Sequence, residues 1–278
     1  MSNEEEIALA VLSDLHINST VALCPPVIDL DDRGTYHSSK AQRWLYKCYL
    51  DFLEKWKSRS GKHVLVINGD IGELDVRRRS AQLVAQNKAT INHIIAQTLE
   101  PALEIADALL VIRGTSAHVG KSAWLEEDFA QDVTSIEVIK TPEGAFSWWS
   151  WCGKIGGVKF EITHHPSTMA GLPWNAKNAV NRMMSEILWK YHIILKQPPP
   201  QVSIFSHGHF CDCNSRDMDE VFVITTPGFQ LATEYIYRRG KMRLAHIGGL
   251  LFNCKNGEYD FTPVLYRMEK ERLWSQKI

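Results

Sequence analysis

Five short segments of the sequence combine aspartate, histidine and glycine at spacings that could bind metal ions. The segments are Asp14-Leu15-His16, Asn68-Gly69-Asp70-Ile71-Gly72-Glu73, Gly114-Thr115-Ser116-Ala117-His118, His164-His165-Pro166 and His207-Gly208-His209. Carboxylate and imidazole ligands suit Mn²⁺, Fe, Zn²⁺ or Ni²⁺. The segments offer more ligands than one ion needs, which favours a centre of two ions. Two ions roughly 3.5–4 Å apart suit in-line displacement of a leaving group at phosphorus.

Two of the segments place candidate ligands two positions apart. In an extended chain, Asp14 and His16 would point to the same side, and the same holds for His207 and His209. Each pair could then hold one ion together or be divided between two neighbouring ions. The spacing leaves both arrangements open.

Each segment closely follows a short apolar run that is typical of a buried strand. The predicted strands lie at residues 7–12, 63–67, 109–112, 158–163, 202–205 and 221–225. In open α/β sheets, ligands bind at the carboxyl ends of the strands. Five of these strands would therefore deliver candidate ligands to one site, provided that they share an edge.

Helical patterns lie between several of these strands. Residues 41–59 and residues 178–195 each place apolar side chains on one helical face, and Ile194 belongs to the second of these faces. Strands that alternate with helices predict an α/β fold, and the crowding of the later strands predicts mixed sheets. No internal repeat or convincing linker divides the chain, so we predict a single domain over residues 1–278.

The composition is that of an ordinary globular protein. The chain has 278 residues and a formal net charge of −1, so any attraction to phosphate must come from a local site. Its six cysteines lack the spacing of a disulfide framework. The acidic N-terminus lacks the basic start of a secretory signal, and no apolar run is long enough to span a bilayer. These features predict a cytoplasmic protein with no membrane partner.

The order of the five segments resembles the calcineurin-like metallophosphoesterase superfamily. The pattern is Asp-x-His, Gly-Asp-x-x-(Asp/Glu), a glycine-to-histidine turn, His-x-Pro and His-x-His, and it covers about seven-tenths of the chain, from Asp14 to His209. Each segment alone is a weak signal, whereas all five in order, each behind a strand, are a specific one. The resemblance implies a fold of two packed mixed β-sheets flanked by helices.

The resemblance also implies how the side chains divide between two metal ions. The ligands of the first ion would be Asp14, His16 and His209. The ligands of the second ion would be His164 and His207, and Asp70 would bridge the two ions. A water between the ions would lose a proton more readily and attack phosphorus.

Asp70 and His118 are the residues to which the resemblance assigns catalytic roles. His118 would lie near the leaving oxygen, as a proton donor or as a stabiliser of the transition state. The segment that contains it departs from the usual Gly-Asn-His-(Asp/Glu) and is similar to a phage-type Gly-Thr-x-Ala-His, where x is often glutamate. Ser116 would then replace a carboxylate, so the second metal would bind loosely or through a water.

Other residues near the segments allow two interpretations. The His-x-Pro pattern favours His164 as the ligand, so His165 is predicted to be a packed or supporting group. Glu73 is either a support for a ligand or a solvated acid. Cys211 and Cys213 repeat the spacing of the preceding histidines and suggest a His/Cys zinc site. No second cysteine pair accompanies them, so free thiols are favoured.

Basic and aromatic clusters could line a substrate-binding rim. The basic residues are Arg77, Arg78 and Arg79, and later Arg238, Arg239, Lys241 and Arg243. Such clusters are most often solvated faces. Three tryptophans, Trp148, Trp149 and Trp151, could stack on bases, but we favour structural roles for them.

The predicted function is that of a phosphodiesterase, such as a nuclease or a nucleotide phosphodiesterase. Its cofactors would be two divalent metal ions, preferably Mn²⁺, with Fe, Zn²⁺, Ni²⁺ and Mg²⁺ as alternatives. Its partner would be a phosphate-ester substrate, such as a nucleic acid or a nucleotide, met in the host cytoplasm if the protein is viral. The alternatives are a phosphomonoesterase and a degenerate phosphoesterase fold that binds phosphate or nucleic acid without turnover.

Overall fold

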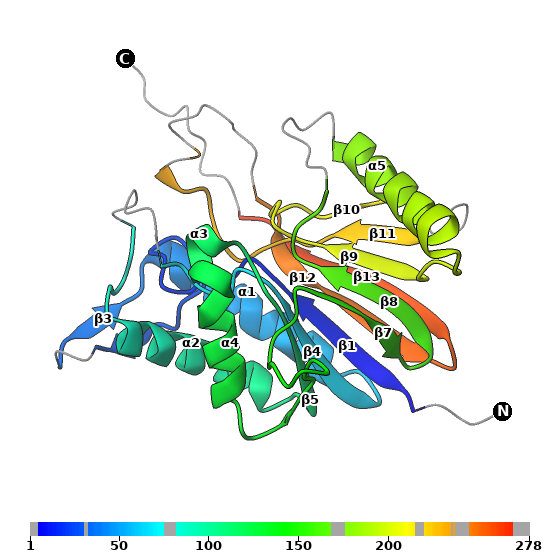
Figure 1. Cartoon of the computed structure of the whole chain (residues 1–278). Coiled ribbons are helices and arrows are strands. Elements are labelled where there is room, and N and C mark those ends of the chain that lie inside the picture. Colours follow the sequence, from blue (N-terminus) through cyan, green and yellow to red (C-terminus); the bar gives the residue numbers. More distant parts are fainter. Residues whose placement is uncertain are drawn as a thin grey trace, which may run out of the picture.

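The protein is described by a computed structural model over residues 5–30, 33–74, 82–167, 176–214, 220–234, 236 and 245–268. Two mixed β-sheets lie at its centre, and helices flank them (Figure 1). A small hairpin of β2 (Val27–Asp29) and β3 (Thr35–His37) lies apart from both sheets.

The first sheet has six strands in the order β13-β12-β1-β4-β5-β6. They are β1 (Ile7–Leu12), β4 (Lys62–Asn68), β5 (Ala108–Ile112), β6 (Glu137–Val138), β12 (Ile247–Lys255) and β13 (Glu258–Tyr266). Strands β1, β4, β5 and β6 are parallel, whereas β12 pairs antiparallel with β1 and with β13. The carboxyl ends of β1, β4 and β5 therefore share one edge.

The second sheet has five strands in the order β10-β11-β9-β8-β7. They are β7 (Ser150–Ile155), β8 (Val158–Thr163), β9 (Val202–Phe205), β10 (Asp212–Cys213) and β11 (Phe222–Thr225). Strands β8, β9 and β11 are parallel, and β7 and β10 close the sheet as antiparallel edges.

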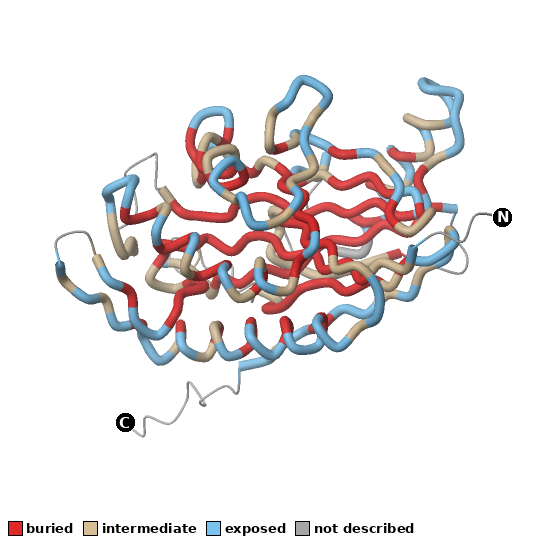
Figure 2. Tube along the Cα trace, turned by 90° about the horizontal axis from the view of Figure 1, so that it is seen from below, coloured by how far each residue is buried: buried red, intermediate tan, exposed pale blue. Residues whose placement is uncertain are grey.

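An apolar core fills the space between the two sheets. Leu9 and Val66 of the first sheet pack with Phe160 and Ile204 of the second sheet, and all four are buried. The opposite face of the first sheet packs on helices, so the central strands β1, β4 and β5 are largely buried, and Figure 2 colours the central strands accordingly. This double burial explains why these strands are short continuous apolar runs.

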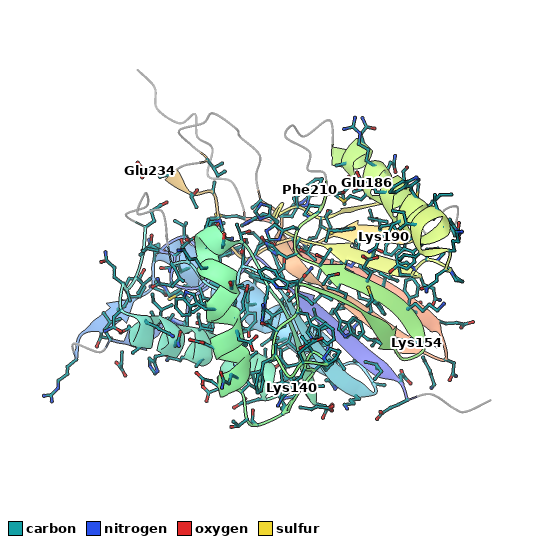
Figure 3. All side chains as sticks on the ribbon, viewed as in Figure 1. Lys140, Lys154, Glu186, Lys190, Phe210 and Glu234 are labelled. Atoms are coloured by element: carbon teal, nitrogen blue, oxygen red, sulfur yellow. The ribbon has the colours of Figure 1, made fainter. Side chains whose placement is uncertain are left out.

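Helices cover the outer faces of both sheets. They are α1 (Lys40–Lys57), α2 (Lys88–Leu103), α3 (Ser116–Val119), η1 (Lys121–Ala123), α4 (Trp124–Asp132), α5 (Ala176–Trp189) and the π-helical turn η3 (Lys190–Leu195). Helices α1, α2 and α4 share one core with the first sheet, and α5 packs on the second. Figure 3 labels Glu186 and Lys190 along this outer helix, where Lys190 Nζ lies 2.5 Å from Glu161 Oε1 of β8.

The start of α1 illustrates how local sequence sets an element. Ser39 caps the helix by accepting a hydrogen bond from the Gln42 N–H, and the Gln42 side chain accepts one from the Ser39 N–H. This capping box satisfies two backbone donors that the first turn leaves unpaired. Along the helix, Leu45, Phe52 and Trp56 are buried against the first sheet.

The predicted fold class is confirmed, since two packed mixed sheets are flanked by helices. All six predicted strands are present, with bounds that differ by at most one residue at either end. One predicted detail is wrong: Ile194 is 55% exposed. It lies in η3, where the helix changes to π geometry, and this change rotates the following side chains away from the predicted face. Among the described residues, no helix is both long and apolar enough to cross a bilayer.

Candidate metal centre

The five segments lie at the carboxyl ends of β1, β4 and β5 in the first sheet and of β8 and β9 in the second. Backbone hydrogen bonds join the first two segments, because the Asp14 N–H donates to the Gly69 carbonyl at 3.0 Å. Across the two sheets, Asn68 Nδ2 donates to Ser206 Oγ at 2.6 Å. Both sheets therefore contribute to one cluster of Asp and His side chains.

One group of candidate ligands contains Asp14, His16 and His209, with its ligand atoms within 4.8 Å of one another. His209 Nε2 lies 3.4 Å from Asp14 Oδ1 and 3.2 Å from His16 Nε2. The spacing-two pair of the first segment thus stays together, whereas His207 belongs to a different group from His209.

A second group contains Asp14, Asp70, His164 and His207. Asp70 Oδ2 lies 3.2 Å from His164 Nε2, 3.7 Å from His207 Nδ1 and 4.0 Å from His16 Nε2. Its carboxylate therefore lies between the imidazoles of both groups. The structure brings together all six side chains for which the sequence predicts metal binding.

Two carboxylate oxygens in this cluster fit a bound cation. Within the described residues, Asp14 Oδ1 and Asp70 Oδ2 are buried without a hydrogen-bond partner. A buried acceptor left in this state costs about 1–3 kcal/mol. Each oxygen faces imidazole nitrogens, so a divalent cation at each group would satisfy it. Carboxylate and imidazole ligands together suit Mn²⁺, Fe, Zn²⁺ or Ni²⁺.

Left-handed backbone places most of the candidate ligands. Asp14, His16, Asp70, His207 and His209 have φ between 42° and 67°. A non-glycine residue in this region costs of order 1 kcal/mol, and such residues gather at functional sites. Extended chain was expected around the spacing-two pairs, and this expectation is wrong because these residues have left-handed backbone.

Hydrogen bonds fix the orientation of His164 and Asp70 in the second group. His164 Nδ1 lies 2.7 Å from the Asn68 carbonyl oxygen, which accepts its proton and turns Nε2 toward Asp70. The Thr115 N–H donates to Asp70 Oδ1 at 2.6 Å and leaves Oδ2 facing the imidazoles. Such contacts set the orientation and basicity of metal ligands.

Charge is closely coupled across these side chains. Burial opposes ionisation of Asp70, but His164 and His207 hold the pKa of its carboxyl well below the usual range. Burial also opposes a charge on His164, yet Asp70 raises the pKa of His164 to about 10. Burial, together with His16, lowers the pKa of His209 to about 4, so this imidazole is neutral at pH 7. A metal binds neutral imidazole, so a cation at the second group would displace the proton that Asp70 favours on His164.

His118 lies beside the first group rather than within either group of predicted ligands. Its Nδ1 is 2.7 Å from Glu73 Oε2, and the same oxygen is 3.2 Å from His16 Nδ1. Burial opposes ionisation of Glu73, but the contacts with His118 and His16 lower its pKa to about 2. Glu73 therefore supports two imidazoles and is not a solvated loop acid.

Thr115, and not Ser116, presents its side chain to the second group. Thr115 Oγ1 lies 3.0 Å from His207 Nδ1, 3.2 Å from His165 Nε2 and 3.4 Å from His164 Nε2. Ser116 instead begins α3. Ser116 is exposed there, and its role in place of a carboxylate stays a prediction.

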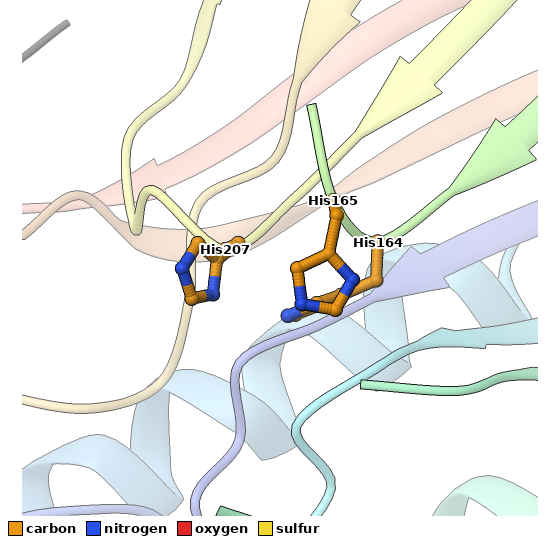
Figure 4. Close-up of side chains that lie close together, drawn as sticks. All are labelled: His164, His165 and His207. Atoms are coloured by element: carbon orange, nitrogen blue, oxygen red, sulfur yellow. The ribbon is translucent and has the colours of Figure 1, made fainter. Parts of the chain in front are cut away.

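His165 is closer to the centre than a packing role requires. Together with His164 and His207 it forms a third group of candidate ligands, and Figure 4 shows the three rings close together. Partial burial and the two neighbouring imidazoles lower the pKa of His165 to about 4. The pattern His-x-Pro favours its neighbour as the ligand, so the sequence did not predict that His165 lies within such a group.

Glu126 is a buried acid that sequence reasoning missed. It lies in α4, where Oε2 accepts the Gly114 N–H at 2.7 Å and Oε1 accepts the Ile71 N–H at 3.4 Å. Burial and the nearby Asp70 raise its pKa to about 8. Its carboxyl joins the loops after β4 and β5, and no motif marks it in the sequence.

Two other hypotheses from the sequence, the His/Cys zinc site and the basic rim, gain no support from the described residues. His16, Glu73 and His118 form a fourth group of candidate ligands, and none of the four groups among the described residues includes Cys211 or Cys213. Burial raises the pKa of Cys211 to about 12, which disfavours the thiolate that binds zinc. The basic clusters at residues 77–79 and 238–243 lie outside the described residues.

Sequence searches find neither a matching protein-family profile nor a matching curated protein. Among solved structures, Vps29 of Cryptosporidium parvum is 9% identical, with a TM-score of 0.44, over 95% of this chain and 100% of its own. Zinc-complexed Vps29 of Entamoeba histolytica is 10% identical, with a TM-score of 0.39, over 93% and 98%. A predicted phosphoesterase of Streptococcus pneumoniae is 9% identical, with a TM-score of 0.37, over 96% and 94%. These scores are too low to inform the site, whose interpretation rests on its motifs and geometry.

Proposed function

We propose that the protein is a metal-dependent phosphoesterase that uses two divalent cations, preferably Mn²⁺, to hydrolyse a phosphodiester. The observation that supports this most directly is the place of Asp70. Its Oδ2 lies 3.2 Å from His164 of one ligand group and 4.0 Å from His16 of the other. A carboxylate between two groups can give an oxygen to each of two ions, and a pair of ions suits displacement at phosphorus.

Each of the two groups would hold one ion, as the motifs imply. Asp14, His16 and His209 would hold one cation, His164 and His207 would hold the other, and Asp70 would contact both. When bound, the cations would supply Lewis-acid activation of a water and of the phosphoryl oxygens. Fe, Zn²⁺, Ni²⁺ and Mg²⁺ are the alternatives to Mn²⁺ for these ligands.

His118 would donate a proton to the leaving oxygen. Its side chain is 33% exposed, so a substrate can reach it. Glu73 occupies the Nδ1 side of the ring, which leaves Nε2 to carry the proton. Burial opposes a charge on His118, but Glu73 and Asp70 raise the pKa of His118 and favour the protonated ring that a general acid needs.

The proposal is tested by hydrolysis of a chromogenic phosphodiester in the presence of Mn²⁺. Wild type is expected to turn over, and Asp70→Asn is expected to lose activity by at least roughly 100-fold. Asp29→Asn, which changes an exposed carboxylate on β2, is the matched control and should retain activity. Undiminished turnover in Asp70→Asn would contradict the proposal.

Two alternative functions give different results in the same assay. A phosphomonoesterase would show a higher kcat/KM for a monoester than for the diester. A protein that only binds phosphate would bind it tightly without turnover of either substrate, across all five metals. The hydroxyl of Thr115, in place of the asparagine that is usual in the superfamily, motivates this second alternative.

A further inference from the structure

Trp149 and Arg113 form a cation–π pair beside the metal centre. The Cζ atom of Arg113 lies over the Trp149 ring, 5.1 Å from its centroid. Arg113 follows β5 and precedes Gly114 and Thr115, so it adjoins the segment whose hydroxyl faces the histidines. Trp149 directly precedes β7 in the other sheet.

A hydrogen bond joins Trp149 to the end of the strand that leads into a candidate ligand. Strand β7 pairs antiparallel with β8, and Ser150 lies opposite Thr163. Thr163 is the last residue of β8 and directly precedes His164. Thr163 Oγ1 donates to the Trp149 carbonyl oxygen at 3.5 Å, and the Arg113 N–H donates to the Trp148 carbonyl at 2.7 Å. The pair is thus held by backbone at the edge where the ligands lie.

The two members of the pair differ in exposure. The Arg113 guanidinium is 16% exposed, donating from Nε to Ser147 Oγ at 2.8 Å and from Nη2 to Glu127 Oε2 at 3.1 Å. Trp149 is 57% exposed. A fixed cation therefore holds a large aromatic ring whose remaining surface is open to solvent.

The neighbouring tryptophans have the structural roles that the sequence favoured. Trp148 Nε1 donates to the Ile139 carbonyl at 2.8 Å, and Trp151 is 8% exposed between the sheets. Trp149 departs from that expectation, because neither anchoring nor core packing accounts for its exposed ring.

We propose that Trp149, held by Arg113, stacks on a base next to the scissile phosphate, so that the substrate is a single-stranded nucleic acid. This inference rests on the proposed phosphoesterase function and names its substrate class. Stacking on an aromatic ring tolerates any base sequence, because every base has a π-face. A ring that is already fixed loses little freedom when a ligand binds, which favours affinity.

Binding of labelled single strands to the Mn²⁺-loaded protein, measured by fluorescence anisotropy, tests the inference. One strand carries bases and the other is abasic with the same length and charge, and phosphorothioate links protect both from hydrolysis. Trp149→Ala is expected to weaken binding of the base-bearing strand by about 10-fold and to leave the abasic strand unchanged. Trp149→Phe should restore most of the affinity. The matched control is Trp189→Ala, which removes a tryptophan that is 59% exposed at the end of α5.

Equal losses for both strands would overturn the inference, because stacking would then not explain the effect. Unchanged binding in Trp149→Ala, or a wild type that binds the two strands equally, would also overturn it. Hydrolysis of glycerophosphocholine, a diester without an aromatic group, is measured in parallel. Turnover of that diester would leave the phosphoesterase function standing even where the stacking inference fails.

Discussion

At the scale of single residues, the contacts of Asp70 fit the proposal that one carboxylate contacts two ions. The Thr115 N–H satisfies Oδ1, and Oδ2 is buried facing imidazoles without a hydrogen bond from the described residues. The left-handed backbone of Asp70, at φ 53°, is a further cost. Bound cations would offset both costs.

The pairing of Glu73 with His118 predicts a specific pH dependence. Against the opposing effect of burial, the carboxylate raises the pKa of His118, so the ring keeps its proton to higher pH. Glu73→Gln removes that charge, and the alkaline limb of the kcat profile is expected to move to lower pH. Glu220→Gln, which alters an exposed Glu–His192 pair at 2.8 Å, serves as control. An alkaline limb that stays in place in Glu73→Gln would show that His118 is not the proton donor.

The hydroxyl of Thr115 predicts a selective effect on the second ion. Thr115→Val keeps the shape of the side chain but removes the oxygen 3.0 Å from His207 Nδ1. Affinity for the second ion is expected to fall roughly 10-fold, while that of the first ion is unchanged. Calorimetric titration with Mn²⁺ separates the two sites, and Thr90→Val in α2 controls for loss of a buried hydroxyl. An equal change at both sites would count against this assignment.

At the scale of elements, close contact between loops sets the geometry of the centre. Gly114 directly follows the loop residue after β5 and packs closely on Asp70. A Cβ atom added at Gly114 would lie only 2.2 Å from the backbone nitrogen of Asp70. Glu126 of α4 then binds the backbone of both loops. A helix and two strands thereby fix one carboxylate, and the glycine is needed for close approach.

Gly114→Ala is expected to separate the loops after β4 and β5. The added methyl group would also meet Asp70 Oδ1 at 2.4 Å, and overpacking of this kind costs about 2 kcal/mol. Metal content and diester hydrolysis should fall together with the melting temperature. Gly144→Ala is strained by the left-handed backbone at φ 91°, but nothing lies within 4 Å of its new methyl group, so it should lower the melting temperature and keep full metal content. Normal metal content in Gly114→Ala would show that the two loops can move apart without loss of the site.

The sequence predicted those elements and residues whose signals are local. Apolar runs marked the strands that end at the site, and short spacings marked Asp14, His16, His207 and His209. Helix α2 was not identified, because Pro101 within it is a residue that usually ends helices. Glu126 was missed because only packing of α4 against the loops, and not its neighbours in sequence, places it behind Asp70.

At the scale of the whole molecule, the centre joins the two sheets. The first sheet supplies Asp14, His16 and Asp70, and the second supplies His164, His207 and His209. Strands β12 and β13 complete the first sheet, although their sequence was not recognised as strand. Residues 248 and 249 of β12 are both glycine, which weakens a strand pattern. Which sheet a strand joins depends on contacts distant in sequence.

Because ligands come from both sheets, metal binding is expected to stabilise the whole fold. An ion at 100 times its Kd contributes about 2.7 kcal/mol, and each kcal/mol raises Tm by about 2–4 °C in a protein of similar size. Addition of Mn²⁺ to chelator-treated protein should therefore raise Tm by roughly 5–10 °C. Scanning calorimetry of wild type and Asp70→Asn tests this, with a smaller rise expected in the variant. Equal rises in both would show that the bridging carboxylate does not contribute.

The central claim is that Asp70 bridges two cations, and electron paramagnetic resonance of the Mn²⁺-loaded protein tests it most directly. Metal content is measured on the same samples of wild type and Asp70→Asn. We predict two ions per chain with the spectrum of a magnetically coupled pair in wild type, and loss of the coupling or of one ion in Asp70→Asn. A single ion per chain, or two uncoupled ions with the same spectrum in both proteins, would contradict the two-cation centre.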